Sequence, residues 1–164
     1  MNMSEQEVLA FIRNRYSYDP MTGSFHFRGG LKDGKIGGRA DGGKGYWRIS
    51  ISGKNYAAHR LAWLYVHGRW PSDQIDHING DKSDNRIANL REASASQNTM
   101  NQGLRKDNST GFKGVYEDKR TGRFRARITV GGKPKNLGFY ATVEDAAAAR
   151  RSAKHLCGEF ARER

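Results

Sequence analysis

The stretch from residue 74 to residue 91 constrains the fold of this chain more than any other segment. Ile75–Ile78 predicts a short strand, residues 79–88 a polar loop, and Asn89–Ala93 a second strand. Residues 94–103 follow as a predicted short helix. A strand–loop–strand–helix unit of about 30 residues is therefore expected at the centre of the chain, within the α+β class.

The composition allows only modest hydrophobic cores. Of the 164 residues, 36% are hydrophobic and 20 are glycine, so two small modules fit better than one large core. No apolar run approaches the ~18 residues of a membrane span. Residues 1–12 contain Glu5 and Glu7 and lack the apolar stretch of a secretion signal, so they are not predicted to be one. The single cysteine, Cys157, excludes an internal disulfide and a cysteine-rich zinc site. We therefore expect a cytoplasmic protein with no membrane partner.

The charge is strongly positive and unevenly distributed. Lys and Arg number 29 against 17 Asp and Glu, which gives a net charge of +12. Residues 1–102 hold 14 basic and 10 acidic side chains, and residues 103–164 hold 15 and 7. The last third thus carries most of the excess. Such a charge favours a polyanionic partner, most often nucleic acid, over solubility alone.

Further elements are predicted before the central unit. Ser4 and Glu7 have the spacing of a capping box at the start of a helix. Leu61, Leu64 and Tyr65 repeat at helical spacing. The predicted elements are helix 4–12, strand 24–28, a glycine-rich loop at 29–45, strand 46–52 and helix 57–67.

Asp76 and His77 stand at the end of the first strand of the central unit. Phosphodiester hydrolysis needs a base, and histidine suits this role because its reference pKa is about 6.5. It also needs a cation, and hard divalent ions prefer carboxylate and amide oxygens. Adjacent strand residues point to opposite faces, so both can serve one site only where the strand ends or twists. A second metal ligand must come from elsewhere, and Asn98 is the best candidate.

Residues 56–102 resemble the HNH endonucleases of the homing and phage type. The motif residues are Asp76-His77-Ile78-Asn79-Gly80-Asp81, Asp84-Asn85-Arg86, Asn89-Leu90-Arg91 and Gln97-Asn98, preceded by the strand and helix that contain Tyr46–Ser52 and Tyr56–Trp63. The resemblance implies a ββα-metal (His-Me finger) core with His77 as the general base. Asp76 and Asn98 would hold one divalent ion, Mg²⁺ or Mn²⁺, and Asn89 would pin the loop between the strands.

Several polar side chains near this motif have two interpretations. Arg91 and Arg60 could stabilise phosphate charge, or they could be positioning or solvated arginines. His59 could be a buried structural imidazole or a residue that supports the site. The remaining polar residues of the loop, Asp81, Asp84 and Asn85, are interpreted as simple loop residues without a role in the site.

The last third of the chain predicts a second module, with strands around turns at residues 118–122 and 131–132 and an alanine-rich helix from Val143. Three arginines alternate with apolar residues, which in a strand gives one basic face and one apolar face. The basic face could enter the major groove of DNA. The arginines are Arg123, Arg125 and Arg127, and the lysines and arginine expected at phosphates are Lys113, Lys119, Arg120, Lys133 and Lys135.

Residues 109–161 resemble the APETALA2/ethylene-response-factor DNA-binding domain. The matching segments are Gly111–Val115, Gly122–Ile128, Leu137–Tyr140 and Thr142–Ala147. The resemblance implies a three-stranded antiparallel sheet in the major groove with a helix behind it. The tryptophans that are usual on the binding face of that family are missing here.

The expected organisation is an N-terminal segment (1–55), a nuclease core (56–104), a linker (105–111) and a DNA-binding domain (112–164). The expected function is a metal-dependent endonuclease on double-stranded DNA, of homing or phage type, acting in the host cytoplasm if phage-encoded. Two alternatives are a non-catalytic, sequence-specific DNA-binding regulator and a protein that binds or cuts RNA. A monomer should nick one strand, and a double-strand break would need a dimer or two events.

Overall fold

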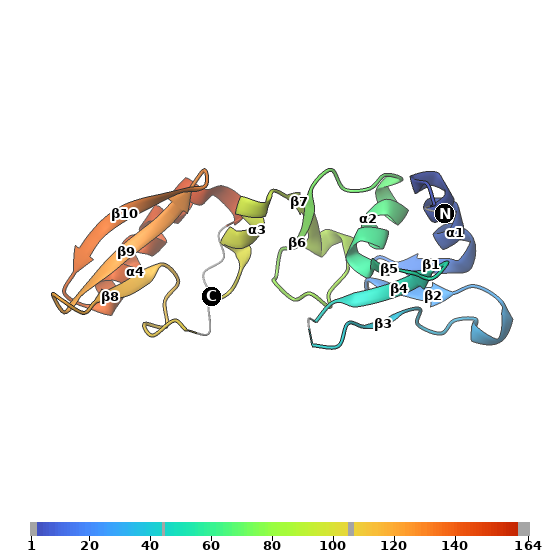
Figure 1. The fold of residues 1–164 in the computed structure, drawn as a ribbon, viewed down its shortest axis with the longest axis horizontal. Coiled ribbons are helices and arrows are strands. Elements are labelled where there is room, and N and C mark those ends of the chain that lie inside the picture. Colours follow the sequence, from blue (N-terminus) through green and yellow to red (C-terminus); the bar gives the residue numbers. More distant parts are fainter. Residues whose placement is uncertain (1–2, 44, 105–106, 161–164) are drawn as a thin grey trace. The chain divides into compact units, whose positions relative to one another are not determined.

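The structure is a computed structural model that describes residues 3–43, 45–104 and 107–160, with no side chains described for residues 158–160 (Figure 1). The described residues form four α-helices and small antiparallel sheets, a mixed α and β fold. They divide into two compact units, Met1–Ala93 and Ser94–Arg164. The boundaries predicted from the sequence remain predictions, and residues 105–106 of the predicted linker lie outside the described residues. No helix in the described part is long and apolar enough to cross a membrane.

The first unit opens with a helix and a hairpin. Ser4 caps α1 through a complete capping box with Glu7, as the sequence predicts. The turn after Asp19 then folds β2 back onto β1. The strand β1 was missed by the sequence analysis, which predicted only the turn and the strand after it. These elements are α1 (Glu5–Arg15), β1 (Tyr16–Asp19) and β2 (Ser24–Phe27).

A three-stranded sheet and a helix follow. The turn between β4 and β5 has positive φ at Ser52 (48°) and Gly53 (79°), the pattern of a type I′ hairpin. The sequence analysis ended its strand at residue 52 and began its helix at residue 57, so it missed the strand β5 between them. Gly68 ends α2 in the left-handed conformation. These elements are the short helix η1 (Gly30–Lys32), β3 (Arg39–Ala40), β4 (Trp47–Ile51), β5 (Lys54–Ala57) and α2 (Ala58–His67).

The first unit ends in the hairpin β6 (Gln74–His77) and β7 (Leu90–Ala93), with the short helix η2 (Ile87–Asn89) before the second strand. Ile75 and Leu90 of this hairpin join a core that also includes Phe25, Ile49 and Leu61. The hairpin is therefore anchored by the same apolar cluster that binds the N-terminal hairpin and α2 together.

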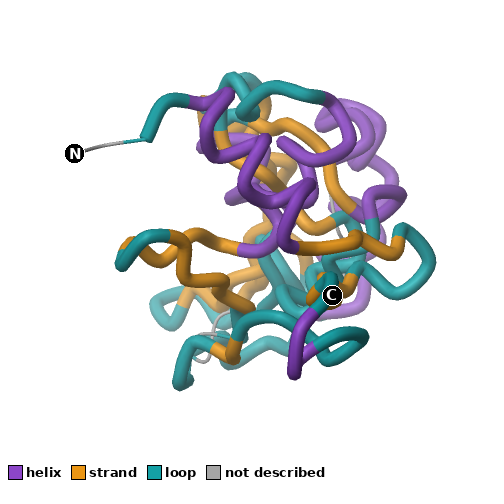
Figure 2. The backbone as a smooth tube through the Cα atoms, turned by 90° about the vertical axis from the view of Figure 1, so that its right-hand side faces the viewer, coloured by secondary structure: helices purple, strands orange, loops and turns teal. Residues whose placement is uncertain are grey.

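The second unit has a three-stranded antiparallel sheet with β9 in the centre and α4 against one face (Figure 1). Figure 2 distinguishes the helices, strands and loops of the chain by colour. Its core is small and consists of Val115, Ala126, Ala146 and Ala147. The predicted helix from residue 143 to 156 is α-helical only to Ser152 and then tightens into η3. The elements are α3 (Ala95–Asn101), β8 (Val115–Asp118), β9 (Arg123–Val130), β10 (Lys133–Tyr140), α4 (Val143–Ser152) and η3 (Ala153–Phe160).

Candidate active site

Asp76 and His77 are the last two residues of β6, and both are buried, with exposed fractions of 3% and 5%. Asp76 lies opposite Arg91 in the antiparallel pair, and both side-chain nitrogens Nε and Nη2 of Arg91 are 2.8 Å from its Oδ2. The carboxylate is therefore oriented by the guanidinium of Arg91. Arg91, for which a direct contact with phosphate was one interpretation, holds Asp76 in this structure.

Asn85 orients the imidazole of His77. The Oδ1 atom of Asn85 lies 3.3 Å from Nε2 of His77, while its amide nitrogen donates to the carbonyl of Ser83. Because Oδ1 can only accept, Nε2 must carry the proton, and Nδ1 is the unprotonated nitrogen of the neutral ring. Burial lowers the pKa of His77, while the bond to Asn85 and the charge of Asp76 act in the opposite direction. A neutral imidazole at neutral pH is the form that can accept a proton.

Asn89 ties together the two ends of the loop between β6 and β7. Its Oδ1 accepts from the backbone of Asn79 at 2.9 Å, and its Nδ2 donates to the carbonyl of Asp84 at 2.8 Å. Its own carbonyl accepts from Ile78. This is the geometry that the role implied by the resemblance requires. The loop is further stabilised by Asp84, whose carboxylate binds Arg86 at 2.6 Å, and this ion pair holds the pKa of Asp84 at about 2.

The N-terminal hairpin supports Asn85 from behind. The hydroxyl of Tyr18 donates to the carbonyl of Asn85 at 2.8 Å, and burial raises the pKa of Tyr18 to about 12. Gly23 approaches so closely that a Cβ there would lie 2.4 Å from Arg86 N. Asn85 itself is 3% exposed. Its interpretation as a simple polar loop residue was wrong, because it contacts His77 and is buried by residues about 65 positions earlier in the chain.

A row of rings packs beside His77. His59 meets His77 edge-on with a centroid distance of 5.1 Å, and Tyr46 lies 5.3 Å from His59. Lys82 lies over the ring of Tyr46 at 4.9 Å. The Nδ1 atom of His59 is buried and has no hydrogen-bond partner among the described residues. Burial, followed by the charges of His77, Arg60 and Arg48, lowers the pKa of His59 to about 3, so this ring is neutral. His59 therefore contacts the candidate site directly.

Arg60, the neighbour of His59 in the sequence, has its contacts with Asp73 and Trp70. Its Nη1 donates to the carbonyl of Asp73 at 3.3 Å, and its guanidinium lies 5.8 Å from the centroid of the Trp70 ring. These contacts describe an arginine that positions the chain between α2 and β6. His59 thus differs from Arg60 in that it contacts His77 directly.

The donor set suits a hard cation. Asp76 offers a buried carboxylate, while the described residues contain no group of three or more His, Cys, Asp or Glu that could hold a metal. A zinc site of three or four such ligands is therefore not built in this part of the chain. Mg²⁺ usually takes one or two carboxylates and keeps several waters, which fits Asp76. The second predicted ligand, Asn98, belongs to α3 in the other unit, and its place in a shared site remains a prediction.

In the second unit, β9 presents its arginines opposite the face covered by α4. Ala126 and Ile128 are buried, while Arg123 and Arg127 are exposed and Arg125 is half-buried. In register with Arg125 stand Tyr116 and Phe139, 49% and 42% exposed. We call this surface the arginine face; it consists of Arg123, Arg125, Arg127, Tyr116 and Phe139.

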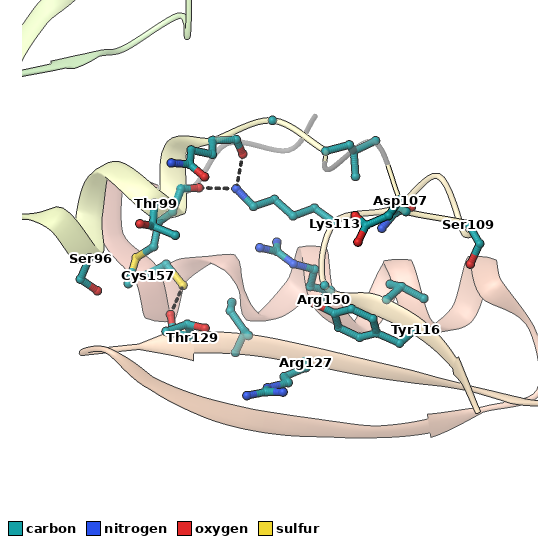
Figure 3. Close-up of a pocket in the computed structure, with 18 of the residues that line it drawn as sticks. Ser96, Thr99, Asp107, Ser109, Lys113, Tyr116, Arg127, Thr129, Arg150 and Cys157 are labelled. Carbon is teal, nitrogen blue, oxygen red and sulfur yellow. Dashed lines mark hydrogen bonds between the residues drawn. The ribbon is translucent and has the colours of Figure 1, made fainter. Parts of the chain in front are cut away.

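The five other cations predicted at phosphates have different positions. Lys119 and Arg120 lie exposed in the turn before β9. Lys133 and Lys135 pair with Val130 and Ile128, which places them on the opposite side from the arginines. Lys113 donates to the carbonyls of Met100 and Gln102 at the end of α3, beside a cavity of about 710 Å³ (Figure 3). Its ammonium is bound by the chain itself, and its predicted phosphate contact remains a prediction.

Part of the sequence is similar to a known protein family. The profile of the HNH endonuclease family matches residues 56–100, and Protein 3.8 of Escherichia phage T7 is 33% identical over 105 residues, which cover 63% of this chain and 87% of that protein. The chain belongs to the HNH endonuclease family.

A second relative is an uncharacterized HNH endonuclease, L560, of Acanthamoeba polyphaga mimivirus, which is 32% identical over 122 residues. This alignment covers 73% of the present chain and 63% of the mimivirus protein. No solved structure matches the chain. The HNH profile ends at residue 100, so the resemblance of the second unit to APETALA2 domains rests on its sequence motifs.

Proposed function

We propose that this member of the HNH family is a metal-dependent DNA endonuclease of phage or homing type, acting in the cytoplasm of the host cell. The observation that carries the proposal is the buried pair of Asp76 and His77, with the His77 ring held in one tautomer by Asn85. A neutral histidine fixed beside a buried carboxylate is suited to activating water next to a cation.

In this proposal the Nδ1 atom of His77 takes the proton of the attacking water. Asn85 keeps the proton of the neutral ring on Nε2, and the charge of Asp76 stabilises the imidazolium that forms. Arg91 holds the Asp76 carboxylate in place. Asp76, with Asn98 as a second ligand, would hold one divalent ion. When bound, this ion would stabilise the negative charge that develops on the leaving 3′-oxygen.

Supercoiled plasmid tests this activity. Wild type with Mg²⁺ or Mn²⁺ should nick it, and His77→Ala should lower the rate by about 10²–10⁴-fold, the usual contribution of a general base. His155→Ala, a histidine of the second unit, is the matched control and should cut like wild type. Uncut plasmid with wild type and both ions, while binding persists, would leave the alternative of a non-catalytic DNA-binding regulator.

We further propose that the second unit holds the DNA through the arginine face, as an APETALA2-like sheet would. Three guanidinium groups on one strand, flanked by Tyr116 and Phe139, suit base edges and phosphates of the major groove. Exposed Lys119 and Arg120 would add phosphate contacts. The Nη2 atom of Arg123 donates to the carbonyl of Phe139, which restricts this side chain to the face.

Binding of His77→Ala protein to a duplex oligonucleotide tests the arginine face. Changing Arg123, Arg125 and Arg127 to Gln should reduce the dependence of log Kd on log[salt] by about 2 to 3, since each lost phosphate contact contributes about 0.9. Changing Lys133 and Lys135 to Gln, on the opposite side, should reduce it less. Duplex RNA should compete poorly, because its major groove is deep and narrow. Equal competition by RNA would contradict this assignment.

A further inference from the structure

A second basic surface lies on the first unit, in the segment predicted from the sequence only as a glycine-rich loop. A groove of about 410 Å³ has Tyr16 and Phe27 in its lining. Its cationic residues are Lys32, Lys35, Arg39 and Arg48. We call this surface the basic groove. No residue of Asp76, His77 or their loop lines it.

The charge of the first unit is concentrated around this groove. Residues 28–48 contain six basic and two acidic side chains, a net of +4, and the remainder of residues 1–102 contains eight of each. Both acids of the segment have local partners: Asp33 accepts from the backbone of Gly29 at 2.7 Å, and Asp41 binds Arg48 at 2.8 Å. The segment therefore carries the whole positive excess of the N-terminal part of the chain.

The loop that carries these cations is held by backbone hydrogen bonds. The amide of Phe27 donates to the carbonyl of Lys35 at 2.9 Å, and the amide of Gly37 donates to the carbonyl of Phe25 at 2.7 Å. The indole of Trp47 donates to the carbonyl of Gly37 at 2.9 Å. The cations are thus presented on a fixed backbone edge along β2, which reduces the entropy lost on binding a ligand.

The cations of the groove repel one another. Arg39 stands directly opposite Arg48 in the pairing of β3 with β4, an arrangement that destabilises a sheet when both charges are alike. Asp41 offsets the charge of Arg48. Among the described residues, no hydrogen bond or ion pair engages the charged groups of Lys35 and Arg39, and that of Lys32 lies over the ring of Phe27 at 5.4 Å. An anion in the groove would relieve this repulsion.

We propose that the basic groove binds the phosphate backbone of duplex DNA, as a second contact separate from the arginine face. This inference rests on the proposed function, since it assumes a DNA substrate. The partner is a polyphosphate and not a single small anion, because the cations are distributed over η1, the following loop and two strands. Ile49, the neighbour of Arg48 on β4, packs in the same core as Ile75 of β6, so the groove and the candidate active site are built on one unit. DNA held in the groove would therefore stay bound to the unit that carries Asp76 and His77.

The salt dependence of duplex binding tests the proposal in full-length His77→Ala protein, which keeps the DNA intact. The groove variant is Lys32→Gln with Lys35→Gln, and the control is Arg13→Gln with Lys54→Gln, which removes the same charge from the same unit. The groove variant should reduce the slope of log Kd against log[salt] by about 2 and weaken binding at 0.1 M salt by about 10- to 100-fold. The control should lower the slope by less than 1. Arg39→Gln alone should reduce the slope by about 1 without lowering the thermal stability, because it removes the repulsion with Arg48.

The outcomes separate the groove from the enzyme. If wild type nicks plasmid and the groove variant keeps the parental slope, the groove is not a DNA contact and the proposed function stands. If wild type neither binds nor nicks DNA, both proposals fail. If the groove variant binds DNA like its parent but no longer sediments with phosphatidylserine vesicles, the polyanion is a membrane surface and the inference is wrong.

Discussion

The two units of the chain bury different kinds of side chain. The first unit encloses large aliphatic and aromatic groups, among them Phe25, Ile49 and Leu61, and within them it buries Asp76 and His77. The buried cluster of the second unit consists of one valine and three alanines, and larger side chains such as Phe124 and Tyr140 are only partly buried against it. Tyr116 and Phe139 stand exposed beside the arginines.

This difference follows from what each unit has to hold. A buried carboxylate and a buried imidazole lose hydration. The ion pair with Arg91 and the hydrogen bond from His77 to Asn85 offset part of that cost, and burial of a large apolar cluster helps to balance the rest. The first unit can therefore position reactive groups away from water. The second unit gains little from its core and presents charge and aromatic surface instead, which suits it to binding. In the proposed function the reactive groups belong to the first unit, while the DNA contacts come from both units, from the basic groove in the first and the arginine face in the second.

Removing a large core side chain should have the largest effect on this contrast. Phe25→Ala should destabilise the first unit by about 3–5 kcal/mol, because the ring packs against Tyr16, Tyr18 and Tyr65. All three tryptophans lie in residues 47–70, so tryptophan fluorescence reports on the first unit alone. The fluorescence midpoint in urea should fall. Val115→Ala, in the small core of the second unit, is the matched control and should leave that midpoint unchanged.

The next effect concerns catalysis rather than folding. Asn85→Ala should lower the rate of plasmid nicking by about 10²-fold, comparable to the loss of about 2.7 kcal/mol of transition-state stabilisation, because the His77 ring loses the acceptor that fixes its tautomer. DNA affinity should be unchanged. Asn55→Ala, an exposed asparagine of β5, is the control. A variant that loses affinity and rate together would indicate that Asn85 only stabilises the fold.

The sequence predicted well those features that depend on neighbours in the chain. The β6–β7 hairpin with its polar loop, the capping box at Ser4, and the alternation of β9 all follow from local spacing. Each is decided by residues a few positions apart. The local pattern also identified Asp76 and His77 as neighbours at a strand end.

The features that the sequence missed depend on contacts between distant segments. Asn85 is buried by Tyr18 and Gly23, and the ring of His59 contacts that of His77, 18 positions away. The basic groove likewise forms only because residues 32–39 fold along β2 and β4. No spacing rule relates such positions. The sequence did contain one indication of the groove, the positive charge of residues 28–48. It was not recognised because charges were counted over residues 1–102 as a whole.

A smaller effect is expected in the pH dependence of the stability of the first unit, which buries a neutral histidine. His59 has a pKa of about 3 in the fold and about 6.5 when unfolded, so between these values the unfolded chain binds a proton that the folded chain does not. This contribution to stability is complete above pH 6.5 and decreases as the pH falls. By pH 5 the free energy of unfolding should fall by about 2 kcal/mol. Urea titrations monitored by tryptophan fluorescence measure this loss. His59→Asn should lose less stability between pH 7 and 5. Equal losses would show that His59 is not buried as a neutral ring.

The smallest effect is expected at the end of α3 in the second unit. Lys113→Met keeps the apolar stem but removes the ammonium that donates to the carbonyls of Met100 and Gln102 (Figure 3). A cation at the C-terminus of a helix stabilises it, and its loss should cost about 1 kcal/mol. Amide hydrogen exchange along Ala95–Asn101 should become faster by about fivefold. Lys113→Arg, which keeps the charge, should exchange like wild type. If Lys113→Met exchanged at the wild-type rate, the ammonium would not anchor α3, and Lys113 would again be available for the phosphate contact predicted from the sequence.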